Sequence, residues 1–460
     1  MNIRFVSALP QYMSDVPEVL RAFFPYIKED ADAENYIELR VSFENNNYTA
    51  QIFSSLGEPV IENFIVDTQD TLIFKRLTKR FVKTALYKYL SSLTNISLPY
   101  GSLTGVRPTR PFYELMEAGE DAEKYLIEHF FVAPDKAKLI AEVVDGQKGI
   151  YKKDPKRVDI FVNIPFCPTR CGYCSFISTE IGRIKKYIPR YIDCVVRELH
   201  QIKAKIAKDN LTLKSIYVGG GTPTSLSADE LEKILNPLAG YGVEFTVEAG
   251  RPDSIDSDKL KVFNDLGVTR ISINPQTFNP QTLQRIGRTH TPEDISQAFE
   301  LARKYPFDIN ADLIAGLPEE SLKDFEDTLK KTLALKPENI TIHTLSIKRG
   351  AEIKNAGAEK SVSGIAREMT DLAREGLALA GYRPYYMYRQ KRSSDNLENT
   401  GYALNGKQCV YNINFMEELT TVFGAGAGAM SKYVFHGENR IERHANPKGL
   451  EDYLKRFEKG

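Results

Sequence analysis

The sequence predicts an α/β protein: a partial (β/α)6 TIM-like barrel, preceded by an N-terminal α+β domain and followed by a C-terminal α+β extension. Two observations predict this fold class. Between residues 153 and 362, six short apolar runs alternate with helical patterns, which is typical of a parallel sheet in a barrel or partial barrel. The flanking segments, 1–152 and 363–460, mix strand and helix patterns without this alternation. A chain of 460 residues is also long enough for about two or three domains.

The N-terminal domain is predicted from a hairpin and several helices. Residues 36–43 alternate apolar and polar side chains, as a half-buried strand does, and the asparagines at 45–47 predict a turn into a strand at 48–54. Apolar residues at helical spacing predict a helix at 74–93. Residues 123–146 predict one helix or a pair broken near Pro134, and the polar stretch 147–157 is the predicted linker.

The barrel is predicted from six strands at 158–164, 215–218, 243–247, 268–273, 307–314 and 340–345. Helices are expected at 183–208, 257–264, 280–286, 292–304 and 321–335, and another begins at Ser227 with a capping-box pattern. In such folds the reactive groups lie at the C-terminal ends of the strands. A helix at 363–379 and a Tyr-rich, less regular tail are expected to follow.

The composition excludes several classes of function. The chain carries 61 Lys+Arg and 61 Asp+Glu, and this zero net charge argues against a general nucleic-acid-binding protein, which needs a cationic excess. No apolar run approaches the roughly 18 residues that a membrane span requires. The first residues lack the pattern of a signal peptide. We therefore expect a cytoplasmic protein.

Three cysteines form the strongest motif. Cys167, Cys171 and Cys174 have Cys-x3-Cys-x2-Cys spacing directly after the first predicted barrel strand. Such clustered thiolates typically bind a metal or an iron–sulfur cluster. A structural zinc site needs a fourth ligand, but the next Cys194 and His200 lie inside a predicted helix. Three cysteines instead suggest a four-iron cluster with one open iron, because such clusters usually take four.

Other polar residues follow the ends of the later strands. Glycines 219–221 end the second strand, where they would expose N–H groups to an anion or carboxylate. Glu248 ends the third strand and is either a ligand-binding carboxylate or a cap of the next helix. Residues 272–278, 310–318 and 343–345 end the remaining strands. Together these residues predict a barrel mouth that holds a ligand.

These motifs resemble the radical S-adenosylmethionine superfamily, whose hallmark is the Cys-x3-Cys-x2-Cys loop. Within it, the chain resembles the oxygen-independent coproporphyrinogen III oxidase family at 164–167, 219–224, 276–278 and 312–318. The tail matches this family at 386–390, 396–402, 409–412 and 423–428. The tail and the N-terminal unit look most like the HemZ-type coproporphyrinogen dehydrogenase branch.

The resemblance implies two cofactors: a 4Fe-4S cluster on Cys167, Cys171 and Cys174, and one or two molecules of S-adenosylmethionine. The reduced cluster would cleave S-adenosylmethionine to a 5′-deoxyadenosyl radical. Asp312 suits a pair of ribose hydroxyls and Arg288 a carboxylate. No catalytic residue is predicted. The residues implied to line or contact the cofactors are Phe161, Tyr173, Gly220, Gly221, Thr222, Glu248, Gln276, Arg288, Asp312 and Leu345.

The resemblance also implies an activity: oxidative decarboxylation of coproporphyrinogen III propionates to vinyl groups, giving protoporphyrinogen IX in haem biosynthesis. The implied partners are a tetrapyrrole substrate and a reduced electron donor of the ferredoxin or flavodoxin type. Oxidases of this family carry a fourth Cys two residues after the third, but this chain has Phe176 there. The same substitution occurs in haem chaperones of the family. A haem chaperone and another radical tetrapyrrole-modifying enzyme are therefore the alternatives.

Overall fold

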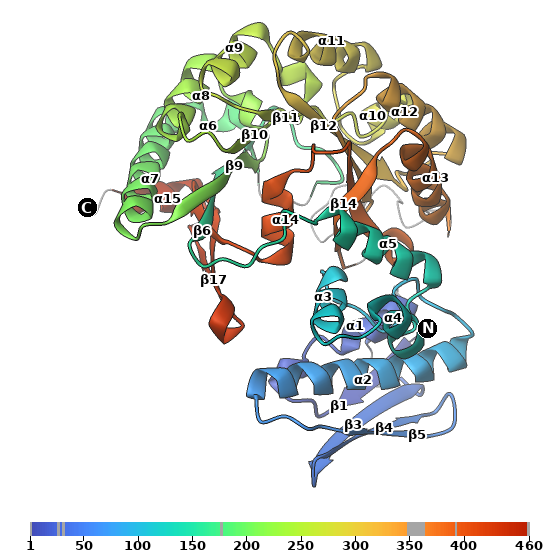
Figure 1. The fold of residues 1–460 in the computed structure, drawn as a ribbon. Coiled ribbons are helices and arrows are strands. Elements are labelled where there is room, and N and C mark those ends of the chain that lie inside the picture. Colours follow the sequence, from blue (N-terminus) through green and yellow to red (C-terminus); the bar gives the residue numbers. More distant parts are fainter. Residues whose placement is uncertain are drawn as a thin grey trace. The chain divides into compact units, whose positions relative to one another are not determined.

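The computed structural model describes residues 2–24, 28–29, 33–174, 178–346, 364–391 and 393–457 (Figure 1). The chain divides into two compact units. Unit 1 comprises Met1–Ala141 and Arg389–Arg392, and unit 2 comprises Glu142–Tyr388 and Ser393–Gly460. The domain boundaries at residues 152 and 362 stay predictions, since compactness alone does not define where an independently folding domain ends.

Unit 1 contains one sheet with helices packed on it. Its strand order is β2-β1-β3-β4-β5, and the predicted hairpin joins β3 to β4 through Asn45 and Asn46, both with positive φ as hairpin turns require. Apolar side chains of α2 lie in one core cluster with those of β3 and β4. The strands are β1 (Asn2–Ser7), β2 (Lys28–Glu29), β3 (Tyr36–Glu44), β4 (Asn47–Ser54) and β5 (Val60–Ile65).

The helices of unit 1 begin and end at recognisable signals. Asp70 caps α2 by accepting hydrogen bonds from the N–H groups of Leu72 and Ile73. The segment 123–146 is a broken pair, because Phe131 has a positive φ and Pro134 starts the next helix. The helices are α1 (Pro17–Phe23), α2 (Thr71–Thr94), α3 (Thr109–Glu117), α4 (Ala122–Phe130) and α5 (Pro134–Gly146), the last of which continues into unit 2.

Unit 2 contains the predicted partial barrel. Six parallel strands lie side by side in the order β13-β12-β11-β10-β9-β6, so that each neighbours the next in sequence. The helices between them lie along the outer side of this sheet in Figure 1. The strands are β6 (Arg157–Ile164), β9 (Thr212–Gly220), β10 (Glu244–Glu248), β11 (Arg270–Ser272), β12 (Asp308–Ala315) and β13 (Asn339–Thr344).

The barrel helices agree with the sequence patterns apart from small shifts at their ends. The predicted helix at 183–208 is divided, because Pro189 begins a new first turn after a short 3-10 segment. Capping boxes start α8, α11 and α12 at Ser227, Thr291 and Ser321. The helices are α6 (Ile181–Ile184), α7 (Ile188–Lys208), α8 (Ala228–Leu235), α9 (Ser257–Asp265), α10 (Pro280–Arg285), α11 (Pro292–Ala302), α12 (Leu322–Ala334) and α13 (Ile365–Leu379).

The barrel strands alternate polar and apolar residues. The apolar positions, such as Ile160, Ile216 and Ile309, pack in one core cluster with side chains of the surrounding helices. The intervening positions face the interior and are mostly polar. Parallel strands that are buried on both faces usually consist of continuous apolar residues. The alternation of polar and apolar residues in these strands therefore indicates that the barrel interior is polar. The interior positions near the strand starts are Asp159, Ser215, Glu244, Arg270, Asp308 and Asn339, and those near the strand ends are Asn163, Gly219, Glu248, Asn274, Asp312 and His343.

The tail consists of strands and helices, as the predicted α+β extension requires, and it is more regular than its Tyr-rich sequence indicated. Its strand β16 pairs in parallel with β6, and β15 pairs antiparallel with β13. These short strands find partners far away in the sequence, so local patterns carry little signal for them. The elements are β14 (Arg383–Arg389), β15 (Glu398–Ala403), α14 (Val410–Glu417), β16 (Thr421–Ala425), β17 (Met430–Phe435), β18 (Arg440–Ala445) and α15 (Leu450–Arg456).

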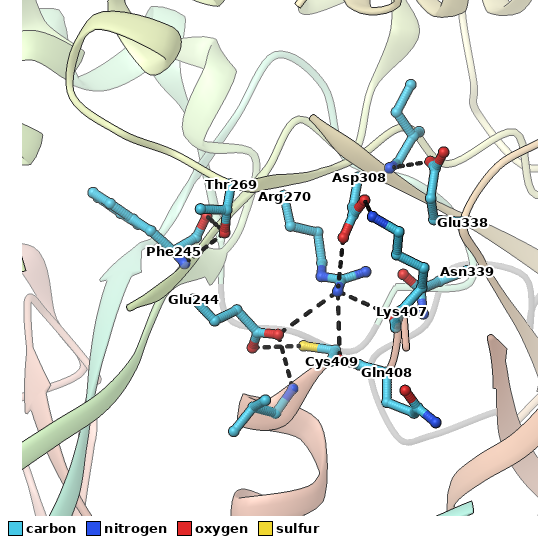
Figure 2. A network of polar contacts seen from close by, with 12 residues as sticks. Glu244, Phe245, Thr269, Arg270, Asp308, Glu338, Asn339, Lys407, Gln408 and Cys409 are labelled. Atoms are coloured by element: carbon cyan, nitrogen blue, oxygen red, sulfur yellow. Dashed lines mark hydrogen bonds and ion pairs between the residues drawn. The ribbon is translucent and has the colours of Figure 1, made fainter. Parts of the chain in front are cut away.

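Helix α14 is anchored at the end of the barrel where the strands start (Figure 2). The Glu244 carboxylate accepts hydrogen bonds from the N–H groups of Val410 and Tyr411, both at 2.9 Å, and from the Cys409 thiol at 3.3 Å. The buried Arg270 guanidinium lies 3.7 Å from Glu244 and donates to the Lys407 carbonyl at 3.0 Å. A carboxylate at the start of a helix satisfies its free N–H groups, so Glu244 fixes α14 against the barrel.

A second buried carboxylate, Asp159, holds the other side of α14. It accepts hydrogen bonds from Ser215 at 2.5 Å, from the Asn414 side chain at 3.1 Å, and from Thr420. Burial raises the pKa of Asp159 to about 6, against the opposing effect of these hydrogen bonds.

The predicted linker is wrong at its first residue. Gln147 is fully buried, and its side-chain NH2 donates to the Tyr385 carbonyl at 3.0 Å and to Glu417 at 3.1 Å. Both partners belong to unit 2, so the start of this polar stretch is part of that unit's interior.

Candidate functional site

The three-cysteine loop begins where β6 ends. Its first residues form β7 (Phe166–Cys167), which pairs with β8 (Thr179–Glu180). The loop is held from the barrel side, where the Gly172 N–H donates to the Ile286 carbonyl at 3.0 Å and the Thr222 hydroxyl lies 3.6 Å from the Cys167 sulfur. Cys171 and Cys174 are joined by a backbone hydrogen bond of 3.1 Å.

All three cysteines are partly exposed, as a ligand set open to a cofactor requires. Over the described ranges, no three Cys, His, Asp or Glu side chains stand close enough together to hold a metal ion. The assignment of Cys167, Cys171 and Cys174 as cluster ligands therefore stays a prediction. Phe176, on which the choice between oxidase and chaperone depends, lies outside the described residues.

The glycine motif after β9 is required by close packing. Gly220 has φ +107°, and a Cβ there would lie 1.9 Å from the Asn163 side-chain oxygen. A Cβ on Gly221 would lie 2.5 Å from the Phe166 carbonyl, and one on Gly219 would lie 2.7 Å from the Glu248 carboxyl carbon. The motif is thus wedged between the base of the cysteine loop and Glu248.

The sequence predicts that the N–H groups of this motif face an anion or a carboxylate, and within the protein one of them faces the Glu248 carboxylate while others donate to backbone carbonyls. The Gly221 N–H donates to the Ile164 carbonyl at 2.8 Å, and the Thr222 N–H donates to the Phe166 carbonyl at 2.7 Å. The Gly220 N–H points to Glu248 at 3.3 Å. In this structure the glycines position the cysteine loop and Glu248.

Glu248 faces the barrel interior. Its carboxylate accepts a 2.7 Å hydrogen bond from the Tyr217 hydroxyl. It does not cap the next helix, because Asp256 does so. Burial, together with the nearby negative charge of Asp312, raises the pKa of Glu248 to about 7, against the opposing effect of Tyr217.

Asp312 lies on β12 beside two strands that also contribute polar groups. It accepts a 2.8 Å hydrogen bond from the Asn310 side chain and lies 3.5 Å from the His343 imidazole. Burial alone would raise its pKa, but the imidazole and hydrogen bonds from neighbouring side chains hold the pKa of Asp312 below its ordinary value. Asp312 is therefore a carboxylate at neutral pH.

Two buried side-chain oxygens at the mouth have no hydrogen-bond partner within the described part of the chain. They belong to Asn274 and to Gln276, whose backbone has φ +67° and donates its N–H to the Asp312 carbonyl at 2.9 Å. Buried amide oxygens normally accept a hydrogen bond. A bound molecule carrying amino or hydroxyl donors, such as S-adenosylmethionine, would satisfy both, so the residues present fit this cofactor.

Arg288 has a different environment from the one expected of a free carboxylate clamp. One Nη donates to the Tyr173 hydroxyl at 2.9 Å, and the other donates to the Gly250 and Asn274 carbonyls at 3.0 and 3.2 Å. Its buried Nε has no partner among the residues of the described ranges. Arg288 thus ties the cysteine loop, through Tyr173, to the ends of two strands, and one N–H is left for a ligand.

The remaining predicted residues lie in two apolar groups. Leu345 packs in a small cluster with Ile286, Ile314 and Leu317, and Tyr173 borders it. Phe161 lies deeper in the interior, with ring centroids 6.3 Å from Tyr217 and 6.4 Å from Tyr411. The roles of these residues at a cofactor stay predictions.

The sequence patterns missed Arg251, which fastens the other end of the cysteine loop. Arg251 forms a two-pronged ion pair with Asp253 at 2.7 and 2.9 Å, and donates to the Thr169 hydroxyl at 2.8 Å. It also donates to Thr289 at 2.7 Å. Arg251 follows the end of β10 by three residues, and this position near a strand end could have marked it as a candidate.

The patterns also missed a network behind the glycine-rich turn at 423–428. The Asn163 side chain donates to the Ala427 carbonyl at 2.5 Å, and its carbonyl accepts a hydrogen bond from Tyr191. The Gly426 N–H donates to the buried Glu198 carboxylate at 2.9 Å. A Cβ on Gly426 would lie 2.3 Å from the Asn163 carbonyl, so this turn is close-packed against the end of β6.

Along the described ranges, no helix has both the length and the hydropathy needed to cross a bilayer.

Comparison with known proteins places this site in a family. Residues 162–332 match the family model described as the radical SAM superfamily. The chain is 38% identical over 405 residues to the Bacillus subtilis (strain 168) oxygen-independent coproporphyrinogen-III oxidase-like protein HemZ, covering 84% of this chain and 80% of that protein. It is 30% identical to the Escherichia coli (strain K12) heme chaperone HemW, covering 64% and 75%.

A solved structure agrees with the fold. The coproporphyrinogen III oxidase (HemN) from Escherichia coli, a radical SAM enzyme, matches with a TM-score of 0.54 and 21% identity, covering 70% of this chain and 72% of that one. The predicted partial barrel is thereby confirmed, and the cofactors of this superfamily are a 4Fe-4S cluster and S-adenosylmethionine. The chain belongs to the HemN-like family of the radical SAM superfamily.

Proposed function

We propose that this protein is an enzyme of tetrapyrrole metabolism that oxidatively decarboxylates propionate side chains of coproporphyrinogen III to vinyl groups, giving protoporphyrinogen IX. The observation that carries this proposal is the 38% identity to HemZ, which extends over 84% of the chain. The polar barrel interior supports it, because a substrate with several charged propionates needs polar partners.

The protein's part in this reaction is to bind, orient and shield. Cys167, Cys171 and Cys174 would hold the cluster, and Gln276 and Asp312 would receive S-adenosylmethionine. When bound, the reduced cluster and S-adenosylmethionine supply a radical that abstracts hydrogen from a propionate side chain. Arg251 and Arg288, through Thr169 and Tyr173, keep the loop against the barrel mouth.

The aromatic side chains in the interior would exclude water from this chemistry. Tyr217 and Tyr411 stack with centroids 4.5 Å apart, and Phe415 stacks on Tyr411 at 5.7 Å. Helix α14 carries two of these rings and is fixed by Glu244 and Asp159. Excluding water lowers the local dielectric and protects reactive species. The electron donor would be a reduced ferredoxin or flavodoxin type protein, and a reducing cytoplasm suits cysteines that form no disulfide in the described part of the chain.

A haem chaperone that delivers haem to apoproteins is the second candidate function. Two observations favour it: the 30% identity to the heme chaperone HemW, and Phe176 in place of the fourth family cysteine. Such a protein would keep the cofactor site and bind haem without decarboxylating coproporphyrinogen III.

One experiment separates the two candidates. The full chain, with its cluster reconstituted anaerobically, is incubated with S-adenosylmethionine, a reductant and coproporphyrinogen III. Substrate-dependent formation of 5′-deoxyadenosine together with vinyl product supports the oxidase. Cleavage of S-adenosylmethionine without decarboxylation, combined with stoichiometric haem binding, would assign the chaperone function.

The cluster site needs its own control. Replacing Cys171 by Ala is expected to abolish the four-iron cluster in either function, measured by iron content and by the visible absorption of the cluster. Replacing Cys194, which is buried within α7, by Ala should leave the iron content unchanged. A full cluster in the Cys171 variant would refute the assigned ligands.

A further inference from the structure

His343 lies at the end of β13, between a group on the neighbouring strand β12 and one on β14, which follows β15 in the sheet. Its Nε2 is 3.5 Å from the Asp312 carboxylate on β12, and its Nδ1 is 3.3 Å from the Tyr388 hydroxyl on β14. Three strands therefore contribute to one line of polar contacts, Asp312–His343–Tyr388, in which Asp312 has a predicted cofactor role and His343 has none.

The Asp312 carboxylate is held from two sides. Asn310 donates to its Oδ1 at 2.8 Å, while His343 faces its Oδ2. Thr341 in turn donates to the Asn310 side-chain oxygen at 3.3 Å. The orientation of the carboxylate is thus fixed by contacts with Asn310 and His343 within the protein.

His343 lies near two carboxyl groups, those of Asp312 and Glu248, and affects the pKa of both. Asp312 and Glu248 are both carboxyl groups facing the barrel interior, and the negative charge of Asp312 raises the pKa of Glu248. His343 lowers the pKa of both groups. Tyr388, the partner on the other side, and Tyr386, whose ring stacks on Tyr388 at 6.5 Å, bring no positive charge. Removing the imidazole would leave two carboxyl groups without their shared cation.

We propose that His343 is a positioning residue of the cofactor site: with Tyr388 behind it, it fixes the Asp312 carboxylate and preserves its negative charge, so that Asp312 can receive the ribose hydroxyls of S-adenosylmethionine. The inference rests on the cofactor role proposed above for Asp312 and is independent of which tetrapyrrole the protein uses.

The test is the affinity for S-adenosylmethionine as a function of pH, measured by equilibrium dialysis on the full chain with its reconstituted cluster. His343→Gln keeps a side-chain N–H for Asp312 but removes the charge. We expect the acid limb of the affinity profile to move to higher pH, so that the loss of affinity is small near pH 8 and grows toward about tenfold only at the acid end of the profile. His343→Asn serves as a second variant if the first does not fold.

Tyr388→Phe is the matched control, because it removes the hydroxyl behind His343 without changing charge. It should weaken binding by a similar factor at every pH and leave the acid midpoint in place. An unchanged midpoint in the His343 variants would overturn the inference. Asp312→Asn tests the underlying role separately: if it binds S-adenosylmethionine as wild type does, the proposed cofactor site itself is wrong.

Discussion

Replacing Glu198 by Gln tests how the tail supports the cofactor site. Glu198 lies on α7 and is buried, with a relative exposure of 6%. Its Oε2 accepts hydrogen bonds from the Gly426 N–H at 2.9 Å and the Tyr453 hydroxyl at 2.8 Å. Its Oε1 accepts one from the Asn446 side chain at 2.8 Å. This carboxylate thus joins the glycine-rich turn and α15 to the helix that follows the cysteine loop.

The expected loss of stability in the Glu198→Gln variant follows from these contacts. In the glutamine variant the remaining oxygen can serve Gly426 and Tyr453, but the new NH2 group faces the NH2 of Asn446. Asn446 cannot turn round without losing the 2.5 Å bond that its oxygen accepts from Arg456. An unsatisfied buried donor costs about 1–3 kcal/mol, and hydrogen bonds to a neutral acceptor are weaker by about 1 kcal/mol. We expect the free energy of unfolding to fall by about 2–4 kcal/mol.

Urea unfolding followed by far-UV circular dichroism measures this loss, since the chain has no Trp for fluorescence. The matched control is Glu451→Gln, which makes the acceptor of an exposed 3.0 Å hydrogen bond from Tyr187 neutral. It should change stability by no more than about 0.5 kcal/mol. If the two variants unfolded at the same urea concentration, the reasoning about Glu198 would be refuted.

Three further predictions concern the barrel. Gly220→Ala places a Cβ 1.9 Å from the Asn163 oxygen at φ +107°, so it should destabilise the fold and reduce S-adenosylmethionine binding in a dialysis assay, whereas Gly182→Ala, which meets nothing within 4 Å, should do neither. The raised pKa of Glu248, about 7 against 4.5, means that apoprotein stability is highest below pH 4.5 for this group and declines up to pH 7. Glu248→Gln should remove this slope, worth up to about 3 kcal/mol, in urea titrations at several pH values. Arg270→Met leaves the partly buried Glu244 carboxylate without its cation, while Asp308 keeps Lys407 at 2.6 Å, and should cost about 1.5–3 kcal/mol by the same unfolding assay; a loss under about 0.5 kcal/mol would contradict it.

The parts of the fold that the sequence predicted are those with local signals. The barrel strands have apolar residues at alternate positions, as in Val158, Ile160 and Val162, and a polar capping residue such as Ser227 marks the start of a helix. The cysteine loop and the residues at the strand ends were identified for the same reason, because parallel strands bring their ends together. Glu248 and Asp312 accordingly lie at one mouth.

The parts that the sequence did not predict depend on contacts between distant segments. Strand β16 pairs with β6 across more than two hundred residues, as between Phe423 and Ile160, so no local pattern could show it. Gln147 reads as part of a polar linker, yet its amide satisfies a carboxylate that comes from the tail. The N–H groups of the glycine motif look available in the sequence, but the turn beside Phe166 already uses them.

The alternation along the six barrel strands separates two sets of positions on the same peptide. Side chains such as Ile216 and Ile309 face outward and determine how tightly the helices pack, while their direct neighbours Tyr217 and Asn310 face inward, where a bound molecule would meet them. A substitution at an inward position can therefore change what the barrel accepts while the outer packing stays intact. Selection for stability and selection for chemistry act on interleaved residues, so relatives with this barrel are free to diverge in substrate without rebuilding their core.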